Sequence, residues 1–99
     1  MKVEHADDKL REIESTPNAG LGCFTPAVVK GFRKRMQLVR AATDIRDLYA
    51  YKGNRLEKLS GDRKNQYSMV LTGNWRLVIE VDQSSSPARI IILEIVDYH

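Results

Sequence analysis

The chain has 99 residues, 42% of them apolar, and a formal net charge of +3 at pH 7. This length and composition predict one globular domain over residues 1–99 with one modest core, because disordered chains contain fewer aliphatic residues. The single cysteine, Cys23, excludes an internal disulfide, and no apolar run has the length of a signal sequence or a membrane span. We therefore expect a cytoplasmic protein without a membrane partner.

The first quarter of the chain predicts a short strand and a short helix. Met1–Ala6 suits an edge strand, because it is short and contains few apolar side chains. Asp7 and Asp8 then give an N-cap signal for an amphipathic helix that includes Leu10 and Ile13. The segment that follows, residues 15–23, contains Pro and Gly residues and predicts a loop.

A longer helix begins at Thr25-Pro26, because Thr caps free amides and Pro at the first helical position has no amide hydrogen to leave unpaired. Its apolar stripe, which we expect to pack on a sheet, consists of Val28, Phe32, Met36 and Val39. The stripe ends near Ala42, and Thr43-Asp44 predicts a cap for a short turn through Leu48.

Residues 55–81 predict a basic turn followed by a hairpin of two strands, around which the rest of the chain is organised. Directly opposed residues must share a face of the sheet, so a two-residue loop at Gly73-Asn74 would mix core and solvent faces. We therefore predict a three-residue loop, 72–74, that places Leu71 opposite Trp75. The same register places Met69 opposite Leu77 and Tyr67 opposite Ile79, and it turns Arg76 away from the core.

The last apolar segment, Arg89–Tyr98, is too apolar on both faces for an edge, which predicts an interior strand. Regular alternation would put Ile91, Leu93 and Ile95 on the same side as Asp97 and His99. The polar segment that precedes it, residues 83–87, is expected to be a loop.

Positive charge is concentrated in the middle of the chain. Residues 25–64 contain eleven Lys and Arg against four Asp and Glu, a net charge of +7, whereas residues 1–24 and 65–99 each have a net charge of −2. The basic segment is a candidate binding surface for a polyanion. The alternative is a solvated helix face that keeps the protein soluble.

The sequence contains no nucleotide-binding loop, no cluster of metal-ligating residues and no plausible nucleophile triad. Arg63, Lys64 and Arg76 suit a phosphate, because guanidinium groups match phosphoryl oxygens. The set Asp97-Tyr98-His99 puts a carboxylate, a phenol and an imidazole together, and an imidazole moves protons near neutral pH. Each set also has a purely structural alternative. Arg63 and Lys64 would be ordinary charges of a turn, and Arg76 would form an ion pair with Glu80. The Asp97-Tyr98-His99 set would be a frayed end of the chain. Trp75 and Tyr67 are expected in the core.

Two stretches, RLEKLSGDRKNQYSMVLTGNWRLVIEV and ILEIVDYH, resemble HigB-type toxins of the RelE/ParE superfamily. The GDRK turn, the Tyr-Ser strand start, the Trp-Arg pair and the terminal Asp-Tyr-His occur in the family's order. The resemblance implies an α+β fold of the RelE type. An N-terminal strand and two or three helices would pack on one face of a twisted, mainly antiparallel sheet of four to five strands, with a basic concave face opposite.

The same resemblance implies a type II toxin that cleaves mRNA on the ribosome without a metal or another cofactor, and that is neutralised by a HigA-like helix-turn-helix antitoxin. In such toxins the RNA 2′-hydroxyl attacks the adjacent phosphate. The implied catalytic residues are Arg63, Arg76, Asp97, Tyr98 and His99. The candidate RNA-binding residues are Lys30, Arg33, Lys34, Arg55, Lys58 and Lys64.

The sequence departs from the family pattern at two positions. Glu57 stands where many HigB-type chains have His, and Ser60 stands where they have Lys, so that Lys58 or Lys64 would have to supply the missing positive charge. Two other functions remain open: a non-catalytic toxin that binds DNA gyrase, as in the ParE branch, and a degenerate module that binds RNA or antitoxin without turnover.

Overall fold

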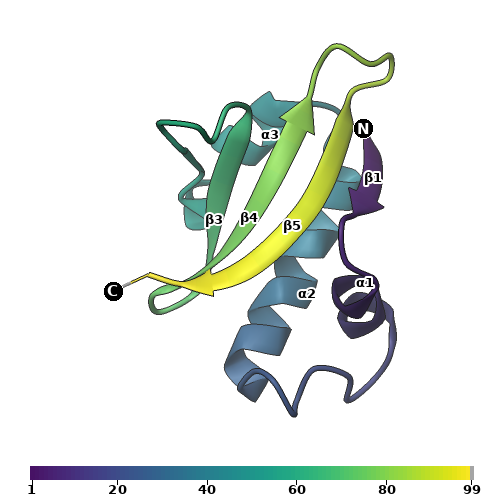
Figure 1. Cartoon of the computed structure of the whole chain (residues 1–99), viewed down its shortest axis with the longest axis vertical. Helices are drawn as coiled ribbons and strands as arrows, with labels where there is room; N and C mark the ends of the chain where they lie inside the picture. Colours follow the sequence, from purple (N-terminus) through teal and green to yellow (C-terminus); the bar gives the residue numbers. More distant parts are fainter. Residues whose placement is uncertain (99) are drawn as a thin grey trace.

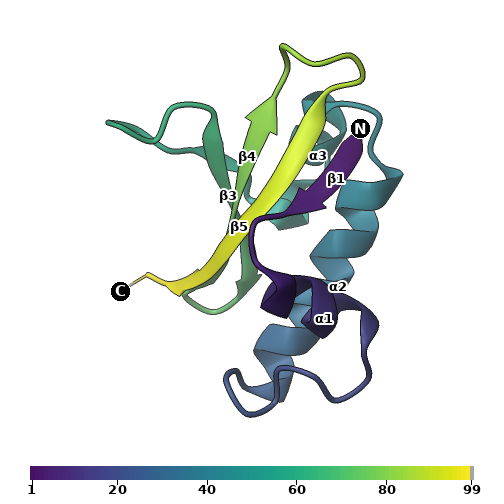
Figure 2. The same ribbon diagram turned by 45° about the vertical axis from the view of Figure 1, so that its right-hand side comes forward.

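A computed structural model describes residues 1–98 of the chain. Three helices pack on one face of a five-stranded mixed sheet with strand order β1-β5-β4-β3-β2 (Figures 1 and 2). Strands β1 and β5 are parallel and all other neighbours are antiparallel. The elements are β1 (Lys2–His5), α1 (Asp8–Ser15), α2 (Pro26–Ala41), α3 (Ile45–Ala50), the 3₁₀ turn η1 (Lys52–Asn54), β2 (Glu57–Lys58), β3 (Gln66–Thr72), β4 (Trp75–Asp82) and β5 (Arg89–Asp97). The predicted α+β fold is confirmed, with β1 at an edge and β5 in the interior.

The helices form where the capping signals predict them. Asp7 accepts a hydrogen bond from the Lys9 amide and Thr25 accepts one from the Val28 amide, which caps α1 and α2. The predicted stripe of α2 is buried, with Phe32 and Val39 fully enclosed. Asp44 caps α3 in a reciprocal capping box with Asp47, so the expected short turn is a helix. In the described part of the chain, no helix is both long and apolar enough to cross a membrane.

Strand β3 contains a bulge at Leu71 that the sequence analysis did not foresee. Met69 opposes Leu77 and Tyr67 opposes Ile79 as predicted, but Thr72 opposes Trp75 and only Gly73 and Asn74 form the loop. The predicted three-residue loop with Leu71 opposite Trp75 is therefore wrong. The extra residue in β3 restores the shared core face of the two strands, whereas the predicted register requires unbroken alternation.

A second irregularity changes the faces of β5. Val78 opposes Glu94 and Ile79 opposes Ile92, so Leu93 is the extra residue. As a result Ile90 and Ile92 are buried in the core, and Ile91 lies opposite Glu80 on the other face. The prediction that Ile91 shares a side with Leu93, Ile95 and Asp97 is wrong, because the bulge reverses the alternation between the two halves of the strand.

Helix α2 contacts the sheet directly at the first bulge. A Cβ atom on Gly31 would lie 2.7 Å from the Leu71 carbonyl oxygen, so only glycine permits this approach. One turn later, Arg35 is 8% exposed and donates from Nε to the Val70 oxygen at 2.7 Å and from Nη2 to the Gly53 oxygen at 2.9 Å. Its guanidinium also lies 5.7 Å from the ring centroid of Tyr51. Arg35 thus satisfies carbonyls near the interrupted strand ladder.

A partly buried ionic cluster joins α1 to α2 and β1. The Glu14 carboxylate lies 2.9 Å from His5 Nε2 and accepts a 2.9 Å hydrogen bond from Arg40 Nη2. The hydrogen bond from Arg40, followed by that from His5, holds the pKa of Glu14 below its ordinary value, although burial acts in the opposite direction. The cluster is therefore more favourable with Glu14 ionised.

This cluster predicts an acid-sensitive contribution to stability. A carboxyl group with a lowered folded-state pKa stabilises the fold above its ordinary pKa, and that stabilisation is lost as pH falls through the folded-state pKa. We expect Glu14→Gln to lower the melting temperature near about pH 5 and to lower it less near about pH 3. Thermal melts followed by circular dichroism would measure both differences. Glu12→Gln, at an exposed position of α1, is the control, and a Glu14→Gln effect independent of pH would contradict the prediction.

Candidate functional site

Arg76 is held rigidly on the sheet face opposite the helices. It lies on β4 beside Val70, and its side chain is 14% exposed. Nε donates to Ser68 Oγ at 2.9 Å, and Nη2 donates to the Arg55 carbonyl oxygen at 2.8 Å. Ser68 is fully buried. The guanidinium is therefore preorganised before any ligand binds.

The segment before β2 is anchored by arginines from both faces of the sheet. Arg35 on α2 binds the Gly53 carbonyl and Arg76 on β4 binds the Arg55 carbonyl. Between them, the buried Asn54 side chain donates to the Leu48 oxygen at 3.0 Å. Arg55 itself has a left-handed backbone with φ 45°, which turns the chain into β2. These contacts fix where β2 starts.

The position of β2 brings Glu57 to Arg76. Glu57 pairs with Ser68 across β2 and β3, and its Oε2 lies 3.6 Å from Arg76 Nη2. Its side chain is 68% exposed, so the carboxylate is accessible to a ligand. The anticipated alternative partner of Arg76, Glu80, is not the one observed. Sequence reasoning noted Glu57 only as a departure from a family, because a two-residue strand is too short to show alternation.

The other predicted catalytic residues come from the end of β5, from the residue that follows it and from the loop between β2 and β3. The Tyr98 amide donates to the Asn74 oxygen at 2.9 Å, and the side chain of Tyr98 is 39% exposed. Asp97 lies opposite Trp75, the residue before Arg76 on β4. Its position is therefore on the other face of the sheet from Arg76. Arg63 lies in the exposed loop between β2 and β3, where its carbonyl accepts from the Gln66 amide. His99 lies outside the described residues.

The expected aromatic core residues do contact the core. Trp75 and Tyr67 are partly buried against it. Trp75 meets Phe24 edge to face with ring centroids 5.8 Å apart, and Tyr67 meets Tyr49 at 6.3 Å. Tyr98 is therefore the more accessible ring for stacking.

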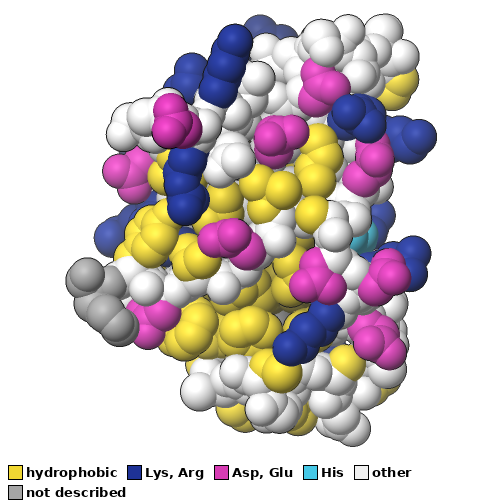
Figure 3. All heavy atoms as spheres, viewed as in Figure 1, with side chains coloured by type: hydrophobic (Ala, Val, Ile, Leu, Met, Phe, Trp, Pro, Cys, Tyr) yellow, Lys and Arg dark blue, Asp and Glu magenta, His cyan; other side chains and the backbone are white. Residues whose placement is uncertain are grey.

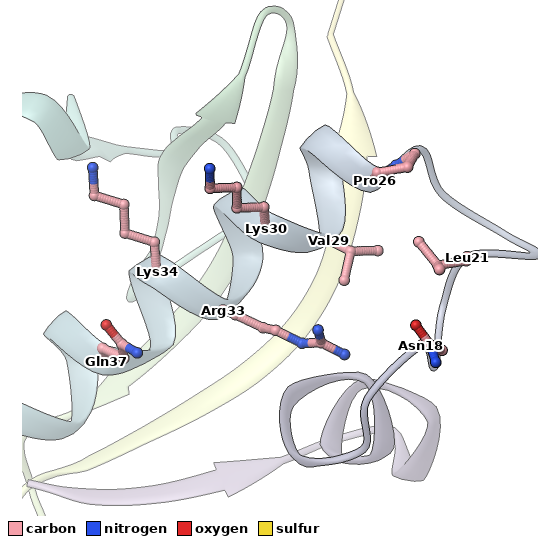
Figure 4. A pocket seen from close by; sticks show the side chains of 8 residues that line it. All are labelled: Asn18, Leu21, Pro26, Val29, Lys30, Arg33, Lys34 and Gln37. Atoms are coloured by element: carbon pink, nitrogen blue, oxygen red, sulfur yellow. The ribbon is translucent and has the colours of Figure 1, made fainter.

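The predicted RNA-binding residues separate into two groups. Arg55, Lys58 and Lys64 are exposed on and around β2, and Figure 3 shows Lys and Arg side chains on that side of the sheet face. The centre of the same face is largely apolar with scattered Asp and Glu, which is less basic than the resemblance implied (Figure 3). The sheet does not bring the second group, Lys30, Arg33 and Lys34, to Arg76. These side chains project from α2, on the other side of the sheet (Figure 4).

Arg33 also has a structural role. Its Nε donates to the Ile13 oxygen at 2.9 Å and its Nη2 to the Thr16 oxygen at 2.7 Å, which ties the end of α1 to α2. Within residues 1–98, no group of three or more His, Cys, Asp or Glu side chains is arranged to hold a metal ion.

Comparison with known proteins agrees with the fold and the motif order. The chain matches the family model of HigB-like toxins, described as RelE-like toxins of the type II toxin–antitoxin system HigB, over residues 4–99. Its structure is similar to that of a YoeB/ParE toxin from Agrobacterium tumefaciens, with a TM-score of 0.60, 18% sequence identity and full coverage of both chains. No curated protein matches the chain by sequence. Because the family model covers nearly the whole chain, the protein belongs to the HigB-like family of RelE-type toxins and functions within a type II toxin–antitoxin system.

Proposed function

We propose that this toxin is a cytoplasmic endoribonuclease that cleaves mRNA on the ribosome and thereby inhibits translation. A HigA-like helix-turn-helix antitoxin neutralises it. The observation that carries the proposal is the juxtaposition of a fixed guanidinium, Arg76, with an accessible carboxylate, Glu57, on the sheet face opposite the helices.

This pair supplies what metal-independent RNA cleavage requires. Attack of the 2′-hydroxyl on the adjacent phosphate needs a group that accepts the hydroxyl proton and a donor that stabilises charge on the phosphoryl oxygens. Nε and Nη2 of Arg76 donate to Ser68 and to the Arg55 carbonyl, and Nη1 is the nitrogen that donates to the phosphoryl oxygen in this proposal. The Glu57 carboxylate accepts the proton, the role that His has in many HigB-type chains.

The remaining predicted residues complete the proposed reaction. Arg63 neutralises a second phosphate from the loop between β2 and β3. The phenol of Tyr98 stacks on a base, and Asp97 and His99 supply orienting and proton-donating groups for the leaving 5′-oxygen. Arg55, Lys58 and Lys64 bind flanking phosphates.

Primer extension on a reporter mRNA in a reconstituted translation reaction tests the proposal. We expect cuts within codons when ribosomes are present and no cuts in naked mRNA. Cuts in naked mRNA would contradict ribosome dependence. Absence of cuts by folded protein would contradict the enzyme, and inhibition of DNA supercoiling would then favour the gyrase-binding function.

Replacement of Glu57 by Gln should reduce the cleavage rate by about 100-fold, because an amide of the same shape accepts no proton. The fold should persist, since an exposed ion pair contributes at most about 1 kcal/mol. Glu94→Gln, an exposed carboxylate opposite Val78 on the same sheet face, is the control. Single-turnover cleavage on programmed ribosomes measures both variants. Wild-type rates for Glu57→Gln would reduce Glu57 to a structural partner of Arg76.

A further inference from the structure

A groove with apolar and cationic side chains lies on the helical side of the molecule. It has a volume of about 540 Å³ and lies between α2 and the loop that joins α1 to α2 (Figure 4). Its apolar lining comes from Leu21, Pro26 and Val29, and its cationic lining from Lys30, Arg33 and Lys34. Leu21 is 45% exposed, so its side chain is accessible to a ligand.

The charge of the groove is uncompensated. No acidic residue lines it. Among residues 1–98, Lys30, Arg33 and Lys34 form no ion pair, whereas Arg40 on the same helix is paired with Glu14. Lys30 and Lys34 are one helical turn apart and extend in parallel from α2 (Figure 4). The occupant that complements this surface therefore carries carboxylates spaced along one side.

The apolar lining distinguishes a peptide from a nucleic acid. Single-stranded RNA binds where aromatic rings stack on its bases, and the groove is lined by aliphatic side chains without an aromatic ring. Leu21 and Pro26 are the exposed apolar side chains of the groove, whereas Val29, which Leu21 faces in Figure 4, is 3% exposed and belongs to the core. An amphipathic helix places apolar anchors and carboxylates on adjacent stripes and fits both parts of the lining.

The groove is also separate from the proposed catalytic face. The buried side of α2 packs on the sheet through Phe32 and Met36, and Arg76 lies on the opposite side of that sheet. A ligand in the groove therefore does not compete with RNA for Arg76. Membership of a type II toxin–antitoxin family implies one protein partner, the antitoxin.

We propose that this groove binds an acidic amphipathic helix of the antitoxin. Apolar side chains of that helix contact Leu21 and Pro26, and its carboxylates pair with Lys30 and Lys34. The inference rests on the antitoxin partner that the family implies and not on RNA cleavage. A toxin without nuclease activity would still bind the helix.

The test is a fluorescence-anisotropy titration of the full-length protein against labelled antitoxin encoded by the neighbouring gene. We expect Leu21→Asp and the double variant Lys30→Glu/Lys34→Glu each to weaken binding by about tenfold or more. The double variant Lys2→Glu/Lys52→Glu changes the net charge equally at exposed positions outside the groove and should retain wild-type affinity. Circular dichroism verifies folding, and the lysine variant suffices if Leu21→Asp misfolds.

Four outcomes would overturn the proposal. If the groove variants bind with wild-type affinity, the antitoxin binds at another surface. If the control variant weakens binding equally, the effect depends on net charge and not on the groove. Loss of ribosome-dependent cleavage with normal antitoxin binding would assign the groove to RNA. A dimer of the protein alone that Leu21→Asp dissociates, measured by analytical ultracentrifugation, would identify a second copy as the occupant.

Discussion

Arg76→Lys is expected to slow cleavage of ribosome-bound mRNA by about 100-fold, the loss seen when one preorganised donor to a developing oxyanion is removed. Lysine preserves the positive charge, but its single nitrogen cannot bind Ser68, the Arg55 carbonyl and a phosphoryl oxygen in the planar geometry of a guanidinium. Arg76→Ala is expected to lose as much activity. Arg76→Ala also removes the donor to the Arg55 carbonyl. The lysine variant therefore distinguishes a loss of catalysis from a loss of folding more clearly.

The measurement is a single-turnover cleavage rate on programmed ribosomes, with thermal melts of the same preparations. Arg46→Lys, at a side chain 87% exposed that pairs only with Asp44 among the described residues, is the control and should cleave normally. A rate for Arg76→Lys within about twofold of wild type would return Arg76 to a purely structural role.

Gly31→Ala is expected to destabilise the fold by about 2 kcal/mol. In an exposed helix the same change would stabilise by about 1 kcal/mol, because alanine is the better helix former. Here the added Cβ would lie 2.7 Å from the Leu71 carbonyl oxygen and 3.0 Å from its carbon, and backbone atoms cannot rotate aside as a side chain does. The steric cost therefore outweighs the propensity gain.

Urea denaturation would give the difference in the free energy of unfolding. Gly22→Ala is the matched control, because an added Cβ there meets no atom within 4 Å. Unchanged or increased stability of Gly31→Ala would show that α2 and β3 can separate without cost, contrary to the close packing described above.

Local patterns in the sequence were sufficient for the helices and most of the strand pairing. Caps at Thr25 and Asp44 marked helix starts correctly, and alternation gave the Tyr67–Ile79 register. The bulges at Leu71 and Leu93 could not be predicted, because each depends on the fit between two strands and the helix behind them. The order of the motifs across the C-terminal half predicted the family correctly.

The site was predictable only in part, for a related reason. An arginine in mid-strand drew attention to Arg76, but its partner Glu57 depends on a backbone turn at Arg55 and on two carbonyl contacts from distant elements. The charge count treated residues 25–64 as one surface. A sum along the chain contains no information about the sheet that separates Lys30 and Lys34 from Arg55 and Lys58.

The position of β5 determines when this toxin can fold. It is synthesised after the other four strands, yet it pairs with both β1 and β4 and so joins the two halves of the sheet. A nascent chain that ends before Arg89 holds β1 and the β3–β4 hairpin without a strand between them. Translation must therefore pass beyond the last apolar segment before the sheet can close, so a prematurely terminated product lacks the assembled fold.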